Sequence, residues 1–188
     1  MHEITLPIIT ERLRLRLFTE NDFAAYALYH RRADVYRYLY APVPSEEKIK
    51  QNLDEAIHGR LNNKDDILFC AVTLRDTNEL IGEALLKLAN PDALQAEIGY
   101  IFNPAYSGKG YATEAIGALL ERGFTEGGFH RIFARLDADN KGSVGIVKRL
   151  GLRQEAHFRQ NDCYDGRFGD ELVYAMLKEE FLAKAAAQ

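Results

Sequence analysis

Two glycines, two residues apart, mark the part of the sequence most suited to chemistry. Gly108 and Gly110 lie between a strand-like segment, 97–102, and an amphipathic segment that begins near Tyr111. Glycine tolerates positive φ angles and leaves no side chain over a helix start, so backbone N–H groups can converge there. The helix dipole adds partial positive charge at the same place. We therefore expect residues 107–112 to bind a phosphorylated cofactor.

The spacing around these glycines excludes two common phosphate loops. A Walker loop requires a glycine at position 103 and a serine or threonine at position 110, where this chain has Asn103 and Gly110. A dinucleotide-binding fingerprint requires a third glycine at position 113, which is Thr113 here. The chain also lacks the regular alternation of strands and helices that the dinucleotide fold needs.

The remaining pattern resembles the acyl-CoA loop of the GNAT N-acetyltransferases, commonly written Q/R-x-x-G-x-G/A. Segments 96–100 (AEIGY) and 110–115 (GYATEA) resemble its RimJ/RimL branch. Ala105 occupies the Gln/Arg position, which removes one side-chain contact but no backbone donor. The structural alternative is an ordinary glycine-rich turn. The resemblance covers residues 10–178 and implies acetyl-CoA as the cofactor.

A later segment, 140–152, resembles the second CoA-binding motif of the same family. Asn140 is expected to contact pantetheine and to cap a helix. Many relatives place a tyrosine at the position of Val147 as the proton donor to sulfur. We expect Ser143 to replace it, although a serine in a first helical turn can also simply bond locally. The predicted cofactor contacts are Tyr100, Ile101, Phe102, Ser107, Gly108, Lys109, Gly110, Tyr111, Ala112, Thr113, Asn140 and Ser143.

Acetyl transfer to an amine requires a base, because an amine with a high pKa is mostly protonated at neutral pH. The resemblance places a candidate at Asp162, after a late strand. Glu97, at the start of the central strand, is a second candidate that would act through water. An exposed or ion-paired acid is the alternative for both. The resemblance also implies that a backbone N–H near Tyr100 or Ile101 holds the thioester oxygen.

The acceptor is expected to bind near three alternating tyrosines, Tyr36, Tyr38 and Tyr40, which could equally be packing residues. The RimJ/RimL resemblance implies a protein or peptide N-terminal α-amine, of the ribosomal-protein type, as the acceptor. A polyamine, an antibiotic or another small amine is the alternative substrate. Because Val147 replaces the usual tyrosine, a non-catalytic acyl-CoA-binding module is a hypothesis of a different class.

Composition limits the remaining possibilities. The chain has 188 residues, a net charge of −4 and a pI of about 5.8, so we expect one domain over residues 1–188 and no binding to nucleic acid. No apolar run is long enough for a membrane span. Cys70 and Cys163 form no CxxC pair, and the histidines show no metal-ligand spacing. We therefore expect a cytoplasmic protein without a metal, which could also form a homodimer.

The order of predicted elements gives the fold class. Strands are predicted at 12–17, 67–74, 80–88, 97–102, 131–136, 153–158 and 171–177, and helices begin near residues 23, 46, 112 and 143. Mostly consecutive strands favour an α+β fold with a mixed, mainly antiparallel sheet and helices on its faces. The GNAT resemblance implies the same twisted sheet, with splayed central strands that open a slot for pantetheine.

Overall fold

The computed structural model describes residues 3–186, and its strands form one eight-stranded sheet in the order β1-β2-β3-β4-β5-β6-β8-β7. The strands are β1 (Ile8–Ile9), β2 (Leu13–Arg16), β3 (Ile67–Leu74), β4 (Leu80–Asn90), β5 (Gln95–Phe102), β6 (Arg131–Asp137), β7 (Arg153–Tyr164) and β8 (Arg167–Leu177). The helices are α1 (Phe23–His30), α2 (Ala33–Tyr36), α3 (Glu46–His58), α4 (Tyr111–Thr125), α5 (Lys141–Leu150) and α6 (Lys178–Ala186), with 3-10 turns η1 (Glu20–Asp22) and η2 (Pro104–Tyr106). All neighbouring strands are antiparallel except β5 and β6. The predicted α+β class and mainly antiparallel sheet are confirmed.

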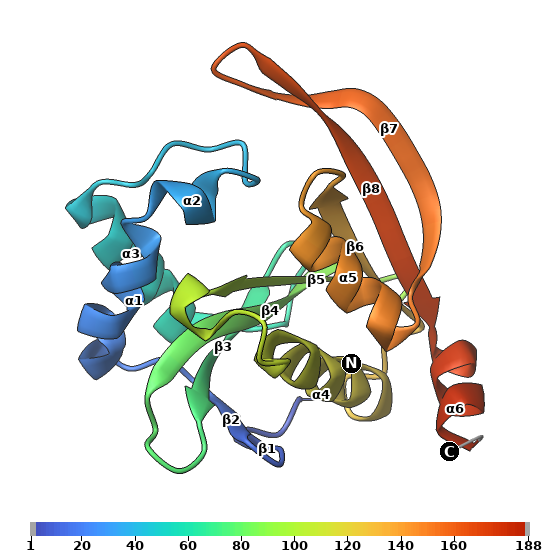
Figure 1. The fold of residues 1–188 in the computed structure, drawn as a ribbon. Helices are drawn as coiled ribbons and strands as arrows, with labels where there is room; N and C mark the ends of the chain where they lie inside the picture. The colour runs from blue at the N-terminus through green and yellow to red at the C-terminus, as the bar shows by residue number, and fades with distance from the viewer. Residues whose placement is uncertain (1–2, 187–188) are drawn as a thin grey trace.

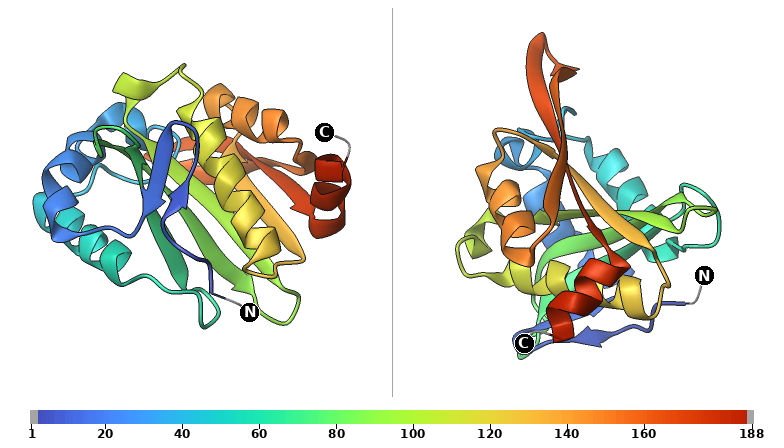
Figure 2. Two further views of the ribbon diagram at one scale, coloured as in Figure 1. Left: turned by 90° about the horizontal axis from the view of Figure 1, so that it is seen from below. Right: turned by 90° about the vertical axis from the view of Figure 1, so that its right-hand side faces the viewer.

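Helices cover both faces of this sheet (Figures 1 and 2). On one face, α4 buries Ile116 and Leu119 in a core that includes Leu86 and Ile98. On the other face, α1 and α3 bury a second core. The two cores follow from the period of two in β4 and β5, whose successive side chains alternate between the faces.

The central strands part at the place that the slot requires. β5 pairs with β6 only from Gln95 to Glu97, although β5 continues to Phe102 and β6 to Asp137. The C-terminal half of β5 is therefore unpaired on its β6 side, which confirms the expected splay. The glycine loop, α2 and α5 all lie around this opening.

Two regions differ from the sequence-based expectation. The segment with the alternating tyrosines, for which the sequence predicted no helix, holds the short helix α2 and a turn. The last two strands are longer than predicted, because Asp165 and Gly166 have φ angles of 50° and 71° and close a tight turn between them. The resulting hairpin projects beyond the rest of the molecule (Figure 1). None of the helices within residues 3–186 has the length and apolar character needed to cross a bilayer.

A buried ion pair fastens the start of α1 to β2. Thr19 and Asp22 form a capping box at the start of η1. The Asp22 carboxylate also accepts two hydrogen bonds from Arg16, at 2.8 and 2.7 Å. Burial alone would raise the pKa of Asp22, but the hydrogen bonds from Arg16 and Thr19 outweigh it and lower the pKa.

We expect Asp22→Ala to lower the free energy of unfolding by about 3 kcal/mol, because it leaves the Arg16 guanidinium without its carboxylate. Since the folded pKa is the lower one, the contribution is complete above the unfolded pKa and is lost as pH falls through the folded value. Urea unfolding of both proteins at several pH values measures the difference. Asp34→Ala, which removes an exposed ion pair with Arg32, is the control and should change stability little. A difference that persists under strongly acidic conditions would contradict the prediction.

Candidate functional site

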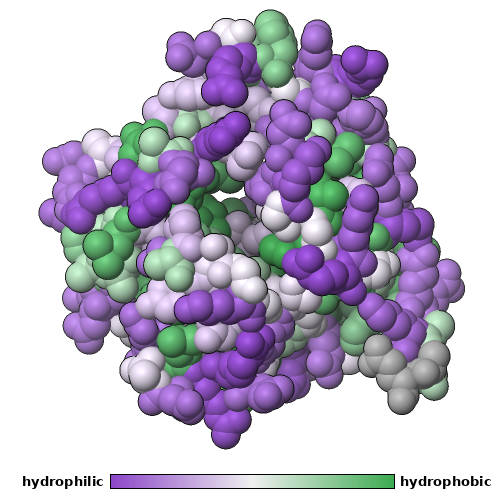
Figure 3. Space-filling view, viewed as in Figure 1, coloured by the Kyte–Doolittle hydropathy of each residue, from purple (hydrophilic) through white to green (hydrophobic). Residues whose placement is uncertain are grey.

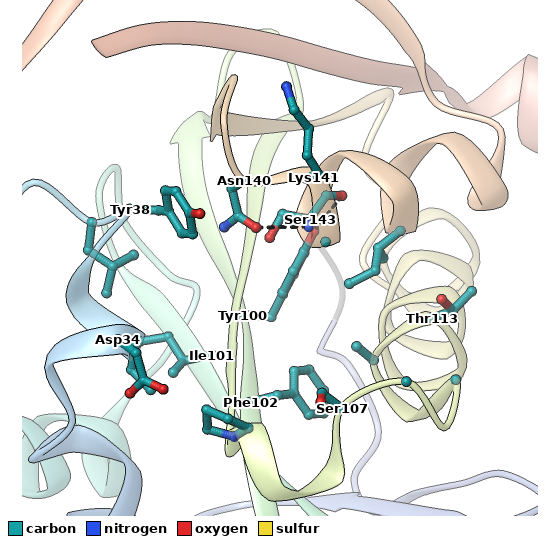
Figure 4. A pocket seen from close by; sticks show the side chains of 18 of the residues that line it. Asp34, Tyr38, Tyr100, Ile101, Phe102, Ser107, Thr113, Asn140, Lys141 and Ser143 are labelled. Carbon is teal, nitrogen blue, oxygen red and sulfur yellow. Dashed lines mark hydrogen bonds between the residues drawn. The ribbon is translucent and has the colours of Figure 1, made fainter. Parts of the chain in front are cut away.

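A cavity of about 780 Å³ opens where β5 and β6 part. Figure 4 shows its wall formed by β5, the glycine loop, the first turns of α4 and α5, and the α2 segment. In Figure 3 the same face is hollowed near its centre, with apolar side chains inside a largely hydrophilic rim. The volume is in the range of small-molecule sites. Its lining residues are Asp34, Val35, Tyr38, Leu39, Tyr100, Ile101, Phe102, Pro104, Ser107, Gly108, Gly110, Ala112, Thr113, Asn140, Lys141, Gly142, Ser143, Ile146 and Arg149.

The glycine loop presents the start of α4 to this cavity. Gly108 and Gly110 have φ angles of 74° and 81°, and Gly110 is the N-cap of α4. A Cβ built on Gly108 would meet no atom within 4 Å, so nothing covers the loop there. The first N–H groups of a helix have no partner within the helix. They can therefore donate to an anion, aided by the helix dipole.

An ion pair from the turn between β1 and β2 braces this loop. The Glu114 carboxylate accepts from the Thr10 hydroxyl at 2.7 Å and from Arg12 Nε at 2.7 Å. Arg12 Nη1 in turn donates to the Lys109 carbonyl at 3.0 Å. Burial alone would raise the pKa of Glu114, but the hydrogen bonds from Thr10 and Arg12 together lower it. The carboxylate therefore stays charged at neutral pH and holds the loop through Arg12.

The cations that line the cavity are Lys141 and Arg149, whereas the sequence suggested Lys109. Lys109 and Tyr111 do not line it; the Lys109 ammonium lies 5.5 Å from the centre of the Tyr106 ring. Lys141 and Arg149, both on α5, line it instead. Arg149 Nε donates to the Thr113 hydroxyl at 3.3 Å and so links α5 to α4. Arg149 therefore supplies positive charge beside the first turn of α4, whereas the Lys141 ammonium donates to the Ala138 carbonyl at 2.7 Å.

The start of α5 and the strand β5 each bring one hydroxyl group to the cavity, from Ser143 and Tyr100 respectively. Asn140 Oδ1 accepts from the Ser143 backbone N–H at 3.1 Å, so Asn140 caps the helix and leaves the Ser143 hydroxyl free of that bond. The Tyr100 hydroxyl donates to the Ser143 carbonyl at 3.3 Å. Burial raises the pKa of Tyr100 to about 12, although the Ser143 side chain and the charge of Arg149 oppose this. Val147 is fully buried and lies outside the cavity wall.

Neither candidate base lines the cavity. Glu97 pairs with Arg135, whose Nε lies 2.9 Å from Oε1. Burial raises the pKa of Glu171 on β8; Arg135 opposes this, whereas Asp162 and Glu97 add to it. Glu97, Asp162, Glu171 and Arg135 thus interact as one charged group, hereafter the β6 charge group.

The three alternating tyrosines lie in different surroundings, because the chain turns between them. Tyr38 lines the cavity, whereas Tyr36 points to His30, with 2.7 Å between its hydroxyl and Nδ1. The Tyr40 hydroxyl donates to Asp137 at the end of β6. A smaller cavity of about 80 Å³ adjoins this place and shares Tyr38 with the first. Its other lining residues are Arg37, Tyr40, Asp137, Asp139, Tyr164, Arg167, Phe168 and Gly169.

Comparison with known proteins decides what this arrangement is. Residues 12–153 match the acetyltransferase (GNAT) domain. The chain belongs to the GNAT acetyltransferases. It is 35% identical over 174 residues to the uncharacterized N-acetyltransferase YnaD of Bacillus subtilis strain 168, an alignment that covers 93% of this chain and 98% of that one.

Solved structures agree with the family. A GNAT-family acetyltransferase from Bacillus anthracis superposes with a TM-score of 0.84 at 31% identity, over 93% of this chain and all of that one. A spermidine N-acetyltransferase from Vibrio cholerae, in complex with CoA and spermine, has a TM-score of 0.80 at 22% identity, over 92% and 99% of the two chains. At that identity the likeness shows the fold alone.

The chain is therefore an enzyme, an N-acetyltransferase that takes its acetyl group from acetyl-CoA. The cavity fits this cosubstrate, because it joins an anion-binding helix start to a mostly apolar slot between parted strands. The sequence motifs identified the loop, β5 and the start of α5, all of which meet at the cavity. They did not identify Lys141, Ile146 or Arg149. Helical spacing on α5 was the available signal, since residues 142, 146 and 149 follow one face.

Proposed function

We propose that this acetyltransferase, as one domain over residues 1–188, acetylates the N-terminal α-amine of a protein or peptide. The small cavity next to Tyr38 carries this proposal. Its wall combines Arg37 and Arg167 with Asp137 and Asp139. A peptide N-terminus presents a cationic amine beside carbonyl oxygens, and so it can use both kinds of charge. A polyamine presents cations alone and would be repelled by the two arginines.

The β7–β8 hairpin supports a peptide as well. Tyr164 and Phe168 stand at its tip with 41% and 66% of their surface exposed, and both line the small cavity. Exposed aromatic side chains are typical anchors for peptide partners. The hairpin also projects beyond the rest of the molecule (Figure 1), so it offers a surface for residues that follow the acetylated one.

In the proposed reaction the nitrogen–carbon bond forms, the carbon–sulfur bond breaks, and one proton moves from the amine to solvent or protein while the thiolate gains one. Backbone donors of the glycine loop hold the diphosphate. A backbone N–H near Tyr100 or Ile101, where β5 has left β6, donates to the thioester oxygen as it gains charge. Ser143 gives a proton to the leaving sulfur.

We expect Asp162→Asn to flatten the acidic limb of the pH dependence of kcat/KM. A carboxylate base must be ionised, so the rate falls as pH drops through its pKa, and an amide has no such limb. Since Asp162 lies outside the cavity wall, the amine proton reaches the β6 charge group through water. Initial rates across the acidic range measure the limb. Asp165→Asn at the exposed hairpin turn is the control. An unchanged limb would transfer the role to Glu97 or to water, which Glu97→Gln then separates.

A polyamine is the second candidate acceptor. Asp34 in the main cavity and Asp137 and Asp139 beside it give the acceptor end acidic groups. The Vibrio cholerae relative in fold is a spermidine N-acetyltransferase.

Thiol release from acetyl-CoA, measured with matched acceptors, tests the proposal. The panel contains peptides with free N-termini, the same peptides with blocked N-termini and an internal lysine, spermidine, and an aminoglycoside. We expect kcat/KM to be highest for the free N-termini, because their lower amine pKa of about 8 leaves more free base. Equal rates for blocked peptides, or a preference for spermidine, would contradict the α-amine proposal.

A further inference from the structure

A chain of buried polar side chains lies between α1, α2 and β4. Glu83 Oε2 accepts from the Tyr29 hydroxyl at 3.3 Å and lies 3.3 Å from His30 Nε2. His30 Nδ1 is 2.7 Å from the Tyr36 hydroxyl. Because Nε2 faces a carboxylate it carries a proton, and Nδ1 shares the second hydrogen bond with the Tyr36 hydroxyl. Only 2% of His30 and 3% of Glu83 are exposed.

Stability alone does not account for this arrangement. Taking a carboxylate and an imidazole out of water is costly, and apolar residues of similar volume are often as stable as a buried polar pair. Nothing in the acetyl-transfer steps uses these groups. The position of these buried polar side chains next to the cavity therefore suggests a role in the active site.

The polar chain ends on the wall of the cavity without entering it. Glu83 on β4 pairs in register with Ile101 on β5, which lines the cavity. Tyr36 follows Val35, which also lines it. Val35 and Ile101 both pack against the core that includes Tyr29. An apolar layer thus lies between the polar chain and the cavity, which argues against direct proton exchange with a bound amine.

The part of the wall that this chain reaches is weakly held by its own backbone. Helix α2 has four residues, and its N-cap residue Arg32 makes no side-chain capping hydrogen bond. Yet α2 and the turn after it supply Asp34, Val35, Tyr38 and Leu39 to the cavity. The Tyr36 hydroxyl connects this segment, through His30, to Glu83 in the middle of the sheet.

We propose that Tyr36, His30 and Glu83 are positioning residues that fix the α2 segment, residues 33–40, as the acceptor-side wall of the active site. The inference rests on the proposed function in one respect, since it assigns this wall to the acceptor. Tyr36→Phe removes the hydrogen bond that joins α2 to His30 and, through His30, to Glu83, and it leaves the ring in place. Tyr29→Phe is the matched control, because it removes a hydrogen bond to the same carboxylate without touching the α2 segment.

We expect Tyr36→Phe to raise the acceptor KM about tenfold, the effect of one lost hydrogen bond, with kcat and the acetyl-CoA KM within about twofold of the wild type. Tyr29→Phe should leave the acceptor KM unchanged. His30→Gln, which keeps a donor toward Glu83 but breaks the bond to Tyr36, should resemble Tyr36→Phe. Equal acceptor KM values for the two tyrosine variants would overturn the proposal. So would a Tyr36→Phe effect confined to a pH limb, which would indicate a proton path.

Hydrogen exchange separates this inference from the proposed function. Tyr36→Phe should speed exchange of amides in residues 33–40 about tenfold relative to Tyr29→Phe, in the protein without any acceptor. Unchanged exchange there would overturn the positioning role, whichever amine the enzyme acetylates. If the acceptor panel identifies no peptide substrate while exchange changes as expected, the α-amine assignment fails. The positioning role of Tyr36 for residues 33–40 is then still supported.

Discussion

Gly108→Val is expected to raise the Kd for CoA at least about thirtyfold, the consequence of strain in the phosphate-binding loop. Gly108 has a φ of 74°, a conformation in which a β-branched residue is a severe outlier. Holding valine there costs about 1–3 kcal/mol, so the loop relaxes to a negative φ instead. The N–H groups that follow then turn away from the cavity, and the helix start loses its convergent donors.

The control for this variant comes from the same chain. Gly166, at the β7–β8 turn, has a φ of 71°, and a Cβ there would also meet no atom within 4 Å. Gly166→Val therefore introduces the same backbone strain far along the chain from the phosphate loop. Calorimetric titration with CoA should give a wild-type Kd for Gly166→Val and a weakened one for Gly108→Val. Equal values for both variants would show that the loop's conformation does not determine binding.

The parts of the fold that sequence predicted are those with local causes. Ile67–Leu74 forms a strand with the predicted bounds, because an apolar run ends in the polar turn before Leu80. Asn140 caps α5 as expected and Ser45 caps α3, since each side chain accepts from the backbone N–H three residues on. Gly151 ends α5 with a φ of 86°. Such signals lie within one turn or one strand of the residues that they affect.

The remainder depends on contacts between distant segments. Tyr36, Tyr38 and Tyr40 alternate in the sequence, but their side chains have different partners. Tyr36 bonds His30, and Tyr40 bonds Asp137. Lys109 is next to the glycines in sequence and yet stacks on Tyr106, whereas Arg149 reaches the cavity from a helix about forty residues later. The buried carboxylate of Glu83 gives no sequence signal, because its partners come from another element.

The separation of β5 and β6 is a feature that the family resemblance predicted and that the residues of these strands alone did not. Nothing in the pattern of 95–102 alone says that pairing stops after Glu97. The family motifs implied it, and the structure shows why it matters. The helix start, the parted strand and the N-terminus of α5 can meet only if β6 turns away there.

Ser143→Ala is expected to lower kcat about a hundredfold, the usual loss when a proton donor in a transition state is removed. The Kd for CoA should change less than about threefold, because Asn140 caps α5 through the Ser143 backbone N–H and not through its hydroxyl. A loss in kcat with unchanged binding identifies an interaction made in the transition state. Steady-state rates with a fixed acceptor, together with titration of CoA, measure the two quantities.

Two further variants determine how the result is interpreted. Ser107→Ala deletes a hydroxyl from the phosphate-loop end of the same cavity, and it should affect CoA binding more than kcat. Tyr100→Phe deletes the other hydroxyl beside α5, a phenol whose pKa burial raises to about 12. Should Ser143→Ala turn over at the wild-type rate while Tyr100→Phe loses activity, the strand and not the helix supplies the proton. Tyr100 on β5 would then take the role of the tyrosine that many relatives have at position 147. Its hydroxyl is close enough, because it bonds the carbonyl of Ser143, one helical turn before Val147.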